Sequence, residues 1–322
     1  MLFNGIMGKP MSDSNKIWIS LYIFYQDLNF LLKEGIIPFV NHICETESIE
    51  KYFFIRYNQE GSHIRLRMYV SENDKAQIEE KTNRFFSKFL KENASTRQFD
   101  HADFRPNNTF SYHEYIPEIY RYGGEKAILE AEHHFFESSK AVLSLIDNQD
   151  SWDIGIAQAK AIQLYTIFFN AVELTDDAIK KMMHIMNNNH WKRRAMEIAK
   201  TNDIDTIFSN LYARQKEIIE RSVGLVKTIL AEDEIEPEWL KLFHESLVKT
   251  DGELDRIFSN GEIVFDSESN IFENNQSDAK ARIYVSYLHM LNNRLGLNNH
   301  DESYMAFVLN ELINSNLIRI TS

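Results

Sequence analysis

Cysteine, proline and glycine are all scarce in this 322-residue sequence, with 1, 5 and 11 residues respectively. The single cysteine, Cys44, excludes an internal disulfide and a metal site built from several thiolates. Within the segment VNHICET, we expect it to be buried and inert. No apolar run is long enough for a membrane span, and the N-terminus lacks the basic start and sustained apolar stretch of a signal peptide. These absences predict a cytoplasmic protein without a membrane span.

Basic residues are also fewer than acidic residues. The chain has 35 Lys and Arg against 48 Asp and Glu, for a formal net charge of −13. Such a balance argues against nucleic-acid binding over the whole surface and leaves only a local basic patch, while it suits a cationic partner. The sequence contains no P-loop, no G-x-G-x-x-G and no G-x-S-x-G. We therefore expect no direct contact with nucleic acid.

Hydrophobic patterning predicts an α+β fold with a strand-rich first part and a helical remainder. Period-two and aromatic runs predict strands at 18–25, 52–57, 64–70 and 109–115. Helical periodicity predicts helices at 29–43 (interrupted at Gly35 and Pro38), 74–92, 125–146, 154–172, 175–186, 204–230, 237–247, 280–297 and 302–318.

The expected organisation is a disordered lead-in at 1–15 and one domain at 16–322, strand-rich over 16–122 and helical over 123–322. Its N-terminal antiparallel sheet, which includes a hairpin, would pack on helices, and a mostly helical C-terminal half would follow.

The hairpin at 51–67, KYFFIRYNQEGSHIRLR, carries the first candidate site. Because side chains alternate along a strand, His63, Arg65 and Arg67 share one face, while Ile64 and Leu66 point into a core. Arg56 joins the cationic face if the register allows. Such a face is stable either when it is solvated or when it meets an anion, and the arginine fork fits a carboxylate or a phosphate. A solvated surface and an anion site therefore both remain open.

Two further segments carry polar side chains at suggestive spacing. In YIPEIYRYGG at 115–124, Glu118 can pair with Arg121 or orient another arginine, or the segment is only a corner with a local ion pair. In YLHMLNNR at 287–294, His289 and Asn293 share a helix face, although a lone histidine is more often structural.

A possible metal pair, formed by a histidine and a glutamate four positions apart, is His133 and Glu137. It lacks a third ligand at a telling distance. We therefore expect no metal site.

Three segments in series resemble a known family. FFIRY…HIRLR at 53–67, YIPEIYRYGG with AEHHFFESSKAVL at 115–143, and SYLHMLNNRLG at 286–296 are similar to the lantibiotic dehydratase C-terminal domain, also called the thiopeptide-type bacteriocin biosynthesis domain. The resemblance covers roughly residues 16–318. It implies a lyase that eliminates glutamate from glutamylated Ser or Thr of a ribosomal precursor peptide, which leaves dehydroalanine or dehydrobutyrine.

The resemblance also implies partners and roles. The partners would be the precursor peptide and a larger, tRNA-dependent glutamylating dehydratase subunit, with this chain as the free-standing small subunit of a split system; a homodimer is one option for its assembly. No cofactor is implied, because the elimination is redox-neutral. The expected catalytic residues are Arg65, Arg67, Glu118, Arg121 and His289, and the expected substrate-binding residues are Arg56, His63, Asn293 and Arg294.

Physical chemistry agrees with these roles. Arginine is no base at neutral pH, so the arginines would hold the glutamyl carboxylate and the developing enolate. His289 would carry the proton as base, acid or both, and Glu118 would orient an arginine. Two alternatives remain: a pyridine synthase, which joins two dehydroalanines on the same fold, and a non-catalytic partner that binds the precursor or acts as a scaffold. The complete set of five catalytic residues favours elimination over pyridine formation.

Overall fold

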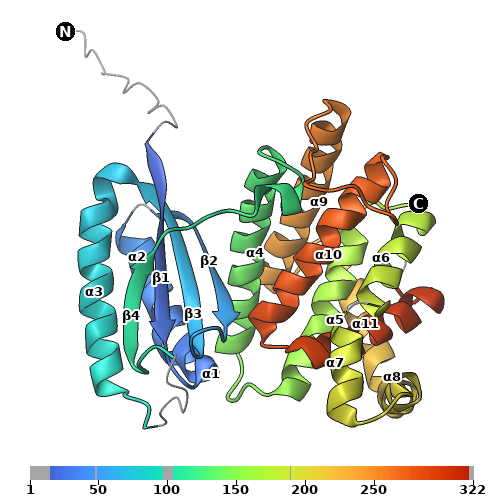
Figure 1. Cartoon of the computed structure of the whole chain (residues 1–322), viewed down its shortest axis with the longest axis horizontal. Helices are drawn as coiled ribbons and strands as arrows, with labels where there is room; N and C mark the ends of the chain where they lie inside the picture. Colours follow the sequence, from blue (N-terminus) through green and yellow to red (C-terminus); the bar gives the residue numbers. More distant parts are fainter. Residues whose placement is uncertain (1–14, 48, 97–103, 189, 319–322) are drawn as a thin grey trace.

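The computed structural model describes residues 15–47, 49–96, 104–188 and 190–318, so nearly all of the predicted lead-in lies outside the described residues. It confirms the α+β prediction: a four-stranded antiparallel sheet lies beside a large helical bundle (Figure 1). The strand order is β2-β3-β1-β4, formed by β1 (Lys16–Phe24), β2 (Ile49–Tyr57), β3 (His63–Ser71) and β4 (Thr109–His113).

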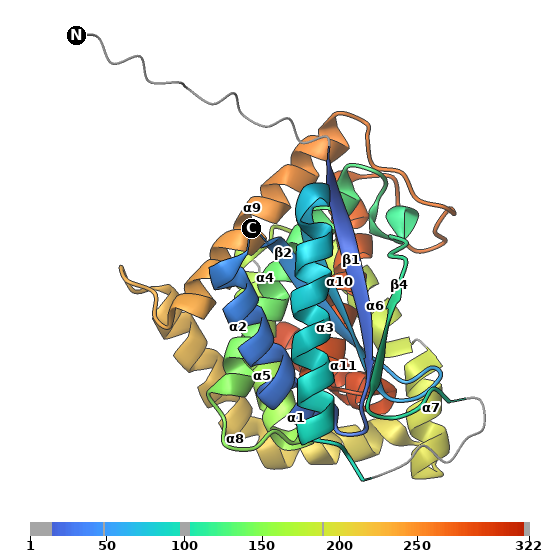
Figure 2. The same ribbon diagram turned by 90° about the vertical axis from the view of Figure 1, so that its left-hand side faces the viewer.

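The sheet buries one face against two N-terminal helical segments. Figure 2 shows α2 (Ile37–Thr46) and α3 (Lys75–Glu92) in front of the strands. Leu21, Leu66 and Phe54 are paired in register and are each 0% exposed on this face. The alternation predicted for the hairpin is therefore confirmed, and the opposite face, which carries Arg65 and Arg67, faces the helical bundle.

The bundle contains the remaining helices, and α4 and α10 lie next to the sheet (Figure 1). Its members are α4 (Ala127–Asp147), α5 (Ile154–Ala171), α6 (Asp176–Asn188), α7 (His190–Ala199), α8 (Ile204–Leu230), α9 (Glu238–Ser259), α10 (Gln276–Leu295) and α11 (Asn299–Asn314). Within the described residues, no helix has both the length and the apolarity needed to cross a membrane.

Three local predictions differ from the structure. The helix expected at 29–43 is not interrupted, because α1 (Leu28–Phe30), a π-helical turn (Leu31–Ile36) and α2 follow one another directly. Pro38 lies at the start of α2, directly after the π-helical turn, and the helical backbone continues through it. Helix α9 extends well past 247, and α7 was not predicted at all.

Cys44 was expected to be buried but is exposed. It lies near the end of α2, where the neighbouring Ile43 takes the inward position instead.

Candidate active site

A cavity of about 970 Å³ lies between the cationic face of the sheet and the bundle. Its lining brings together most of the residues proposed from sequence: Arg56, Arg65, Arg67, Glu118, Arg121, His289 and Asn293. They come from strands β2 and β3, from the segment before α4, and from α10. Segments more than two hundred positions apart in sequence therefore meet at one concave surface.

Arg65 is clamped between two aromatic rings. Its guanidinium carbon lies 3.5 Å from the ring centroid of Tyr57 and 4.4 Å from that of Tyr22. Its Nε donates to Nε2 of His63 at 3.1 Å. Within the described residues, no carboxylate lies at ion-pair distance from Arg65.

Arg67 is the more deeply buried of the two strand arginines, at 7% exposure. Its guanidinium carbon lies 4.7 Å from the ring centroid of Tyr115 and 5.3 Å from that of Phe53. Burial lowers the pKa of Arg67, because the cation loses its hydration. Among the described residues its buried Nε has no hydrogen-bond partner. A desolvated cation with an unsatisfied donor is suited to receiving an anion.

Arg121 is held at the rim by a carboxylate and a hydroxyl. It lies in a 3-10 turn, η3 (Ile119–Tyr122), where its Nη1 donates to the Glu118 carboxylate at 3.1 and 3.3 Å. Its Nε donates to Oγ of Ser286 on α10 at 3.1 Å. Gly123 follows with φ +89°, and a Cβ there would come within 2.9 Å of Ile283 on α10. The glycine therefore allows the turn to approach α10 closely enough for this contact.

His289 is held by a buried glutamate that the sequence did not indicate. Its Nδ1 lies 2.9 and 3.0 Å from the two carboxylate oxygens of Glu302 on α11. Glu302 is 7% exposed. Burial raises the pKa of Glu302, and the contact with His289 opposes that shift. A neutral imidazole that donates from Nδ1 carries its lone pair on Nε2. That nitrogen can then accept a proton.

Nothing in the local sequence marks Glu302 as part of a site. It lies in the first turn of α11, beside the capping box formed by Asn298 and Asp301. Acidic residues are common in first turns because they complement the helix dipole. Only the fold, which brings the first turn of α11 to α10, reveals the contact with His289.

Asn293 fastens α10 to the edge of the sheet. Its Oδ1 accepts from the backbone N–H of Arg56 at 2.9 Å, and its Nδ2 donates to the backbone carbonyl of Arg56 at 2.8 Å. Arg56 is paired with Ile64, so the register places its side chain on the face opposite Arg65. Its guanidinium donates to the backbone carbonyl of Arg294 and to Oδ1 of Asn29. Arg56 therefore does not join the cationic face.

His63 and Arg294 do not line the cavity. His63 is 1% exposed and contacts Arg65. Arg294 is 0% exposed, its Nε donates to Oγ of Ser139 at 3.0 Å, and burial lowers its pKa to about 9. Both lie one layer behind residues that reach the cavity.

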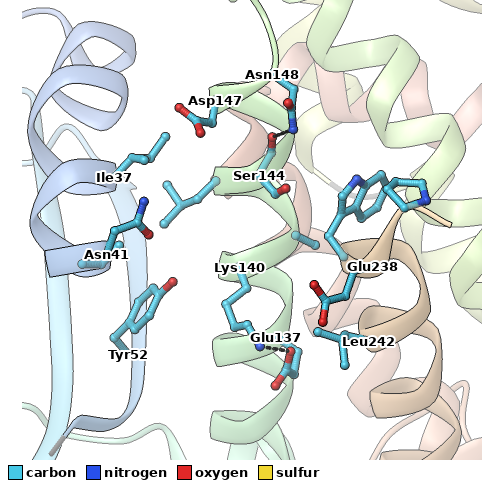
Figure 3. Close-up of a pocket in the computed structure, with 15 residues that line it drawn as sticks. Ile37, Asn41, Tyr52, Glu137, Lys140, Ser144, Asp147, Asn148, Glu238 and Leu242 are labelled. Carbon is cyan, nitrogen blue, oxygen red and sulfur yellow. Dashed lines mark hydrogen bonds and ion pairs between the residues drawn. The ribbon is translucent and has the colours of Figure 1, made fainter. Parts of the chain in front are cut away.

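A second cavity, of about 430 Å³, lies over the outer face of α4, between α2 and the start of α9 (Figure 3). None of the candidate site residues lines it. Glu137, from the possible metal pair, instead contacts Lys140 there at 3.1 Å. Throughout the described ranges, no three His, Cys, Asp or Glu side chains are grouped as metal ligands would be.

Comparison with known proteins identifies the family. The chain belongs to the family described as lantibiotic biosynthesis dehydratase C-term, which matches residues 18–313. This confirms the resemblance found in the sequence. Membership places the chain among proteins that modify ribosomally made peptides.

Individual relatives are distant. The epidermin biosynthesis protein EpiB of Staphylococcus epidermidis is 23% identical over 304 residues, which cover 92% of this chain and 26% of EpiB. This chain therefore spans about a quarter of the length of that curated relative.

Solved structures share the fold. The pyridine synthase TbtD from thiomuracin biosynthesis matches with a TM-score of 0.69 at 13% identity, over 93% of this chain and 98% of TbtD. TsrL matches with a TM-score of 0.64 at 15% identity, over 95% of this chain and 99% of TsrL. The tRNA-dependent lantibiotic dehydratase MibB from Microbispora sp. 107891 matches with a TM-score of 0.60 at 15% identity, over 96% of this chain and 29% of MibB.

Proposed function

We propose that this protein eliminates glutamate from glutamylated Ser or Thr residues of a ribosomal precursor peptide. The observation that carries the proposal is one cavity that combines the cations Arg65 and Arg67 with the His289–Glu302 pair. In the reaction, a base takes the α-proton of the esterified residue. The electron pair forms the Cα–Cβ double bond, the Cβ–O bond breaks, and glutamate leaves as its carboxylate. Atoms and charge balance without an oxidant or a reductant.

The arginines supply positive charge where negative charge develops. Removal of the α-proton places charge on the neighbouring peptide carbonyl, and departure of glutamate places charge on its carboxylate. Arg65, Arg67 and Arg121 would divide these tasks. Each charge-assisted hydrogen bond of this kind contributes about 1.5–3 kcal/mol. The desolvation of Arg67 makes its contact with an anion stronger than a contact at the surface would be.

His289 would move the proton, as base, acid or both. Glu302 holds its Nδ1 and stabilises the imidazolium that forms when Nε2 accepts a proton. Glu118 would orient Arg121 and reduce its net charge at the rim.

The volume of the cavity supports a peptide substrate. At about 970 Å³ it is at the upper end of the range for small-molecule sites, so it accommodates residues on either side of the reacting one as well as the glutamyl group. A glutamylating component would supply the ester. Because the chain carries a net charge of −13, we expect docking to a cationic surface to weaken at high salt. Gel filtration at two salt concentrations would test this, and salt-insensitive association would count against it.

The second candidate function is formation of a pyridine ring from two dehydroalanines. The full-length fold match to the pyridine synthase TbtD favours it. The cations of the cavity favour elimination, because a substrate with two dehydroalanines carries no glutamyl carboxylate that would require them.

Mass spectrometry of a short peptide with a glutamyl-Ser ester, with a leader segment supplied, tests the proposal. The wild type should release glutamate and leave dehydroalanine, whereas His289→Ala and Arg121→Ala should leave the ester intact. His42→Ala, at an exposed position on α2, is the matched control and should behave as the wild type does. An ester that survives the wild type would refute elimination. A peptide with two dehydroalanines, offered next, would reveal ring formation.

A further inference from the structure

The side chains that hold Arg65 are all neutral. Its guanidinium lies between the rings of Tyr57 and Tyr22, and its Nε donates to His63. Arg121 differs, because Glu118 pairs with it at 3.1 Å. Neutral holders fix the orientation of a cation without reducing the charge that it presents. Among the described residues, Arg65 is therefore held without a direct ion pair that would offset its charge.

The contacts of His63 fix a single neutral tautomer. Its Nδ1 lies 2.8 Å from the backbone carbonyl of Gly61, which can only accept, so Nδ1 carries the hydrogen. Its Nε2 receives the Nε–H of Arg65 at 3.1 Å, so Nε2 carries the lone pair. Gly61 has φ +112°, which glycine adopts without strain, and this conformation lies in the turn that joins β2 to β3.

The surroundings of His63 keep the ring uncharged. The ring is 1% exposed and packs against Phe24 at a centroid distance of 4.6 Å. Burial lowers the pKa of His63 to about 4; Arg65 and His113 also lower it, while the Gly61 carbonyl and Glu60 raise it. A protonated ring would have no acceptor for Arg65 and would place a second positive charge beside it.

We infer that His63 is a positioning residue for Arg65, rather than a residue that binds the substrate itself. Its neutral Nε2 directs the guanidinium so that the Nη groups remain available to an anion in the cavity. The consequence for catalysis rests on the proposed function, whereas the tautomer and its contact with Arg65 do not.

Nuclear magnetic resonance of the whole chain, labelled with ¹⁵N in histidine, tests the tautomer directly. Long-range ¹H–¹⁵N correlations at pH 7 should show a neutral, Nδ1-protonated ring that is lost in His63→Phe, a variant that keeps the packing of an aromatic ring. Its Nε2 signal should change in Arg65→Met. An Nε2-protonated ring or an imidazolium at position 63 would overturn the inference, as would an Nε2 signal that Arg65→Met leaves unchanged.

Kinetics of glutamate release then test the consequence. His63→Phe should lower kcat/KM by about 10- to 100-fold, as expected for a misplaced charge-stabilising group. His63→Gln can still donate to the Gly61 carbonyl and accept from Arg65, and should recover at least half of that loss on a logarithmic scale. His133→Gln is the matched control, because burial also lowers the pKa of His133 to about 4, yet this histidine lies on α4 and makes no contact with Arg65.

Failure of the proposed elimination activity and failure of the positioning role of His63 would give different results. A wild type that releases no glutamate would refute the proposed function, and the resonance experiment would still decide the role of His63. Full activity in a folded His63→Phe would refute the positioning role even where elimination is confirmed.

Discussion

Arg67→Met should abolish elimination and at the same time stabilise the protein. Arg67 is 7% exposed, its Nε is buried without a partner among the described residues, and burial lowers its pKa. Methionine retains an apolar stem of similar reach and removes the cation. A residue whose removal stabilises the fold has another role, which in the proposed function is the binding of an anion.

The expected magnitude follows from two opposing terms. Relief of an unsatisfied buried donor is worth about 1–3 kcal/mol. Loss of the contacts with Tyr115 and Phe53 costs about 0.5–2 kcal/mol. The net gain is about 1 kcal/mol in the free energy of unfolding. For a chain of 322 residues, with about 2.1 cal/mol/K of unfolding entropy per residue, this gain raises Tm by roughly 1.5 °C.

Thermal unfolding in the absence of substrate provides the assay, combined with glutamate release from the ester peptide. Arg256→Met is the control, because Arg256 is an exposed partner of Glu253 on α9 and its replacement should change stability by less than about 0.5 kcal/mol. A fall in Tm of more than about 3 °C for Arg67→Met would show that the buried cation is stabilised by the fold and would refute the reasoning. Retained activity would remove Arg67 from the proposed mechanism.

Three further outcomes are expected. Glu302→Gln should lower glutamate release by about 10- to 100-fold with little change in Tm, because it removes the charged partner of His289; an unchanged rate would exclude that role. Glu118→Gln should have a smaller effect, less than about 10-fold, because the pair with Arg121 is partly exposed and Ser286 also holds that arginine; complete loss of activity would instead indicate a direct role in the reaction. His134 is 1% exposed, and burial lowers its pKa well below 6.5, so the unfolded chain takes up a proton that the folded chain does not. Stability should therefore fall as pH drops below 6.5, by up to about 1.4 kcal/mol per pH unit from this residue. Denaturant titrations of His134→Phe should show a shallower dependence, and an unchanged slope would contradict this account.

Local sequence patterns were sufficient for the strands, most helices and the central motif. Strand alternation has a period of two, so the hairpin alone placed Arg65 and Arg67 on one face. The helix predicted at 204–230 from its periodicity likewise matches α8 in both bounds. The predicted site residues Glu118, Arg121 and His289 also line the cavity. Their functional roles remain predictions.

The sequence by itself thus determined the sheet, the helical remainder and the family, because these depend on spacings within short segments. Only the tertiary structure decided which side chains reach the cavity. Register placed Arg56 on the strand face opposite Arg65, packing buried Arg294 out of reach of the cavity, and α11 brought Glu302 to His289. Contacts of this kind join residues from separate elements, and burial depends on every neighbour at once, so no local spacing encodes them.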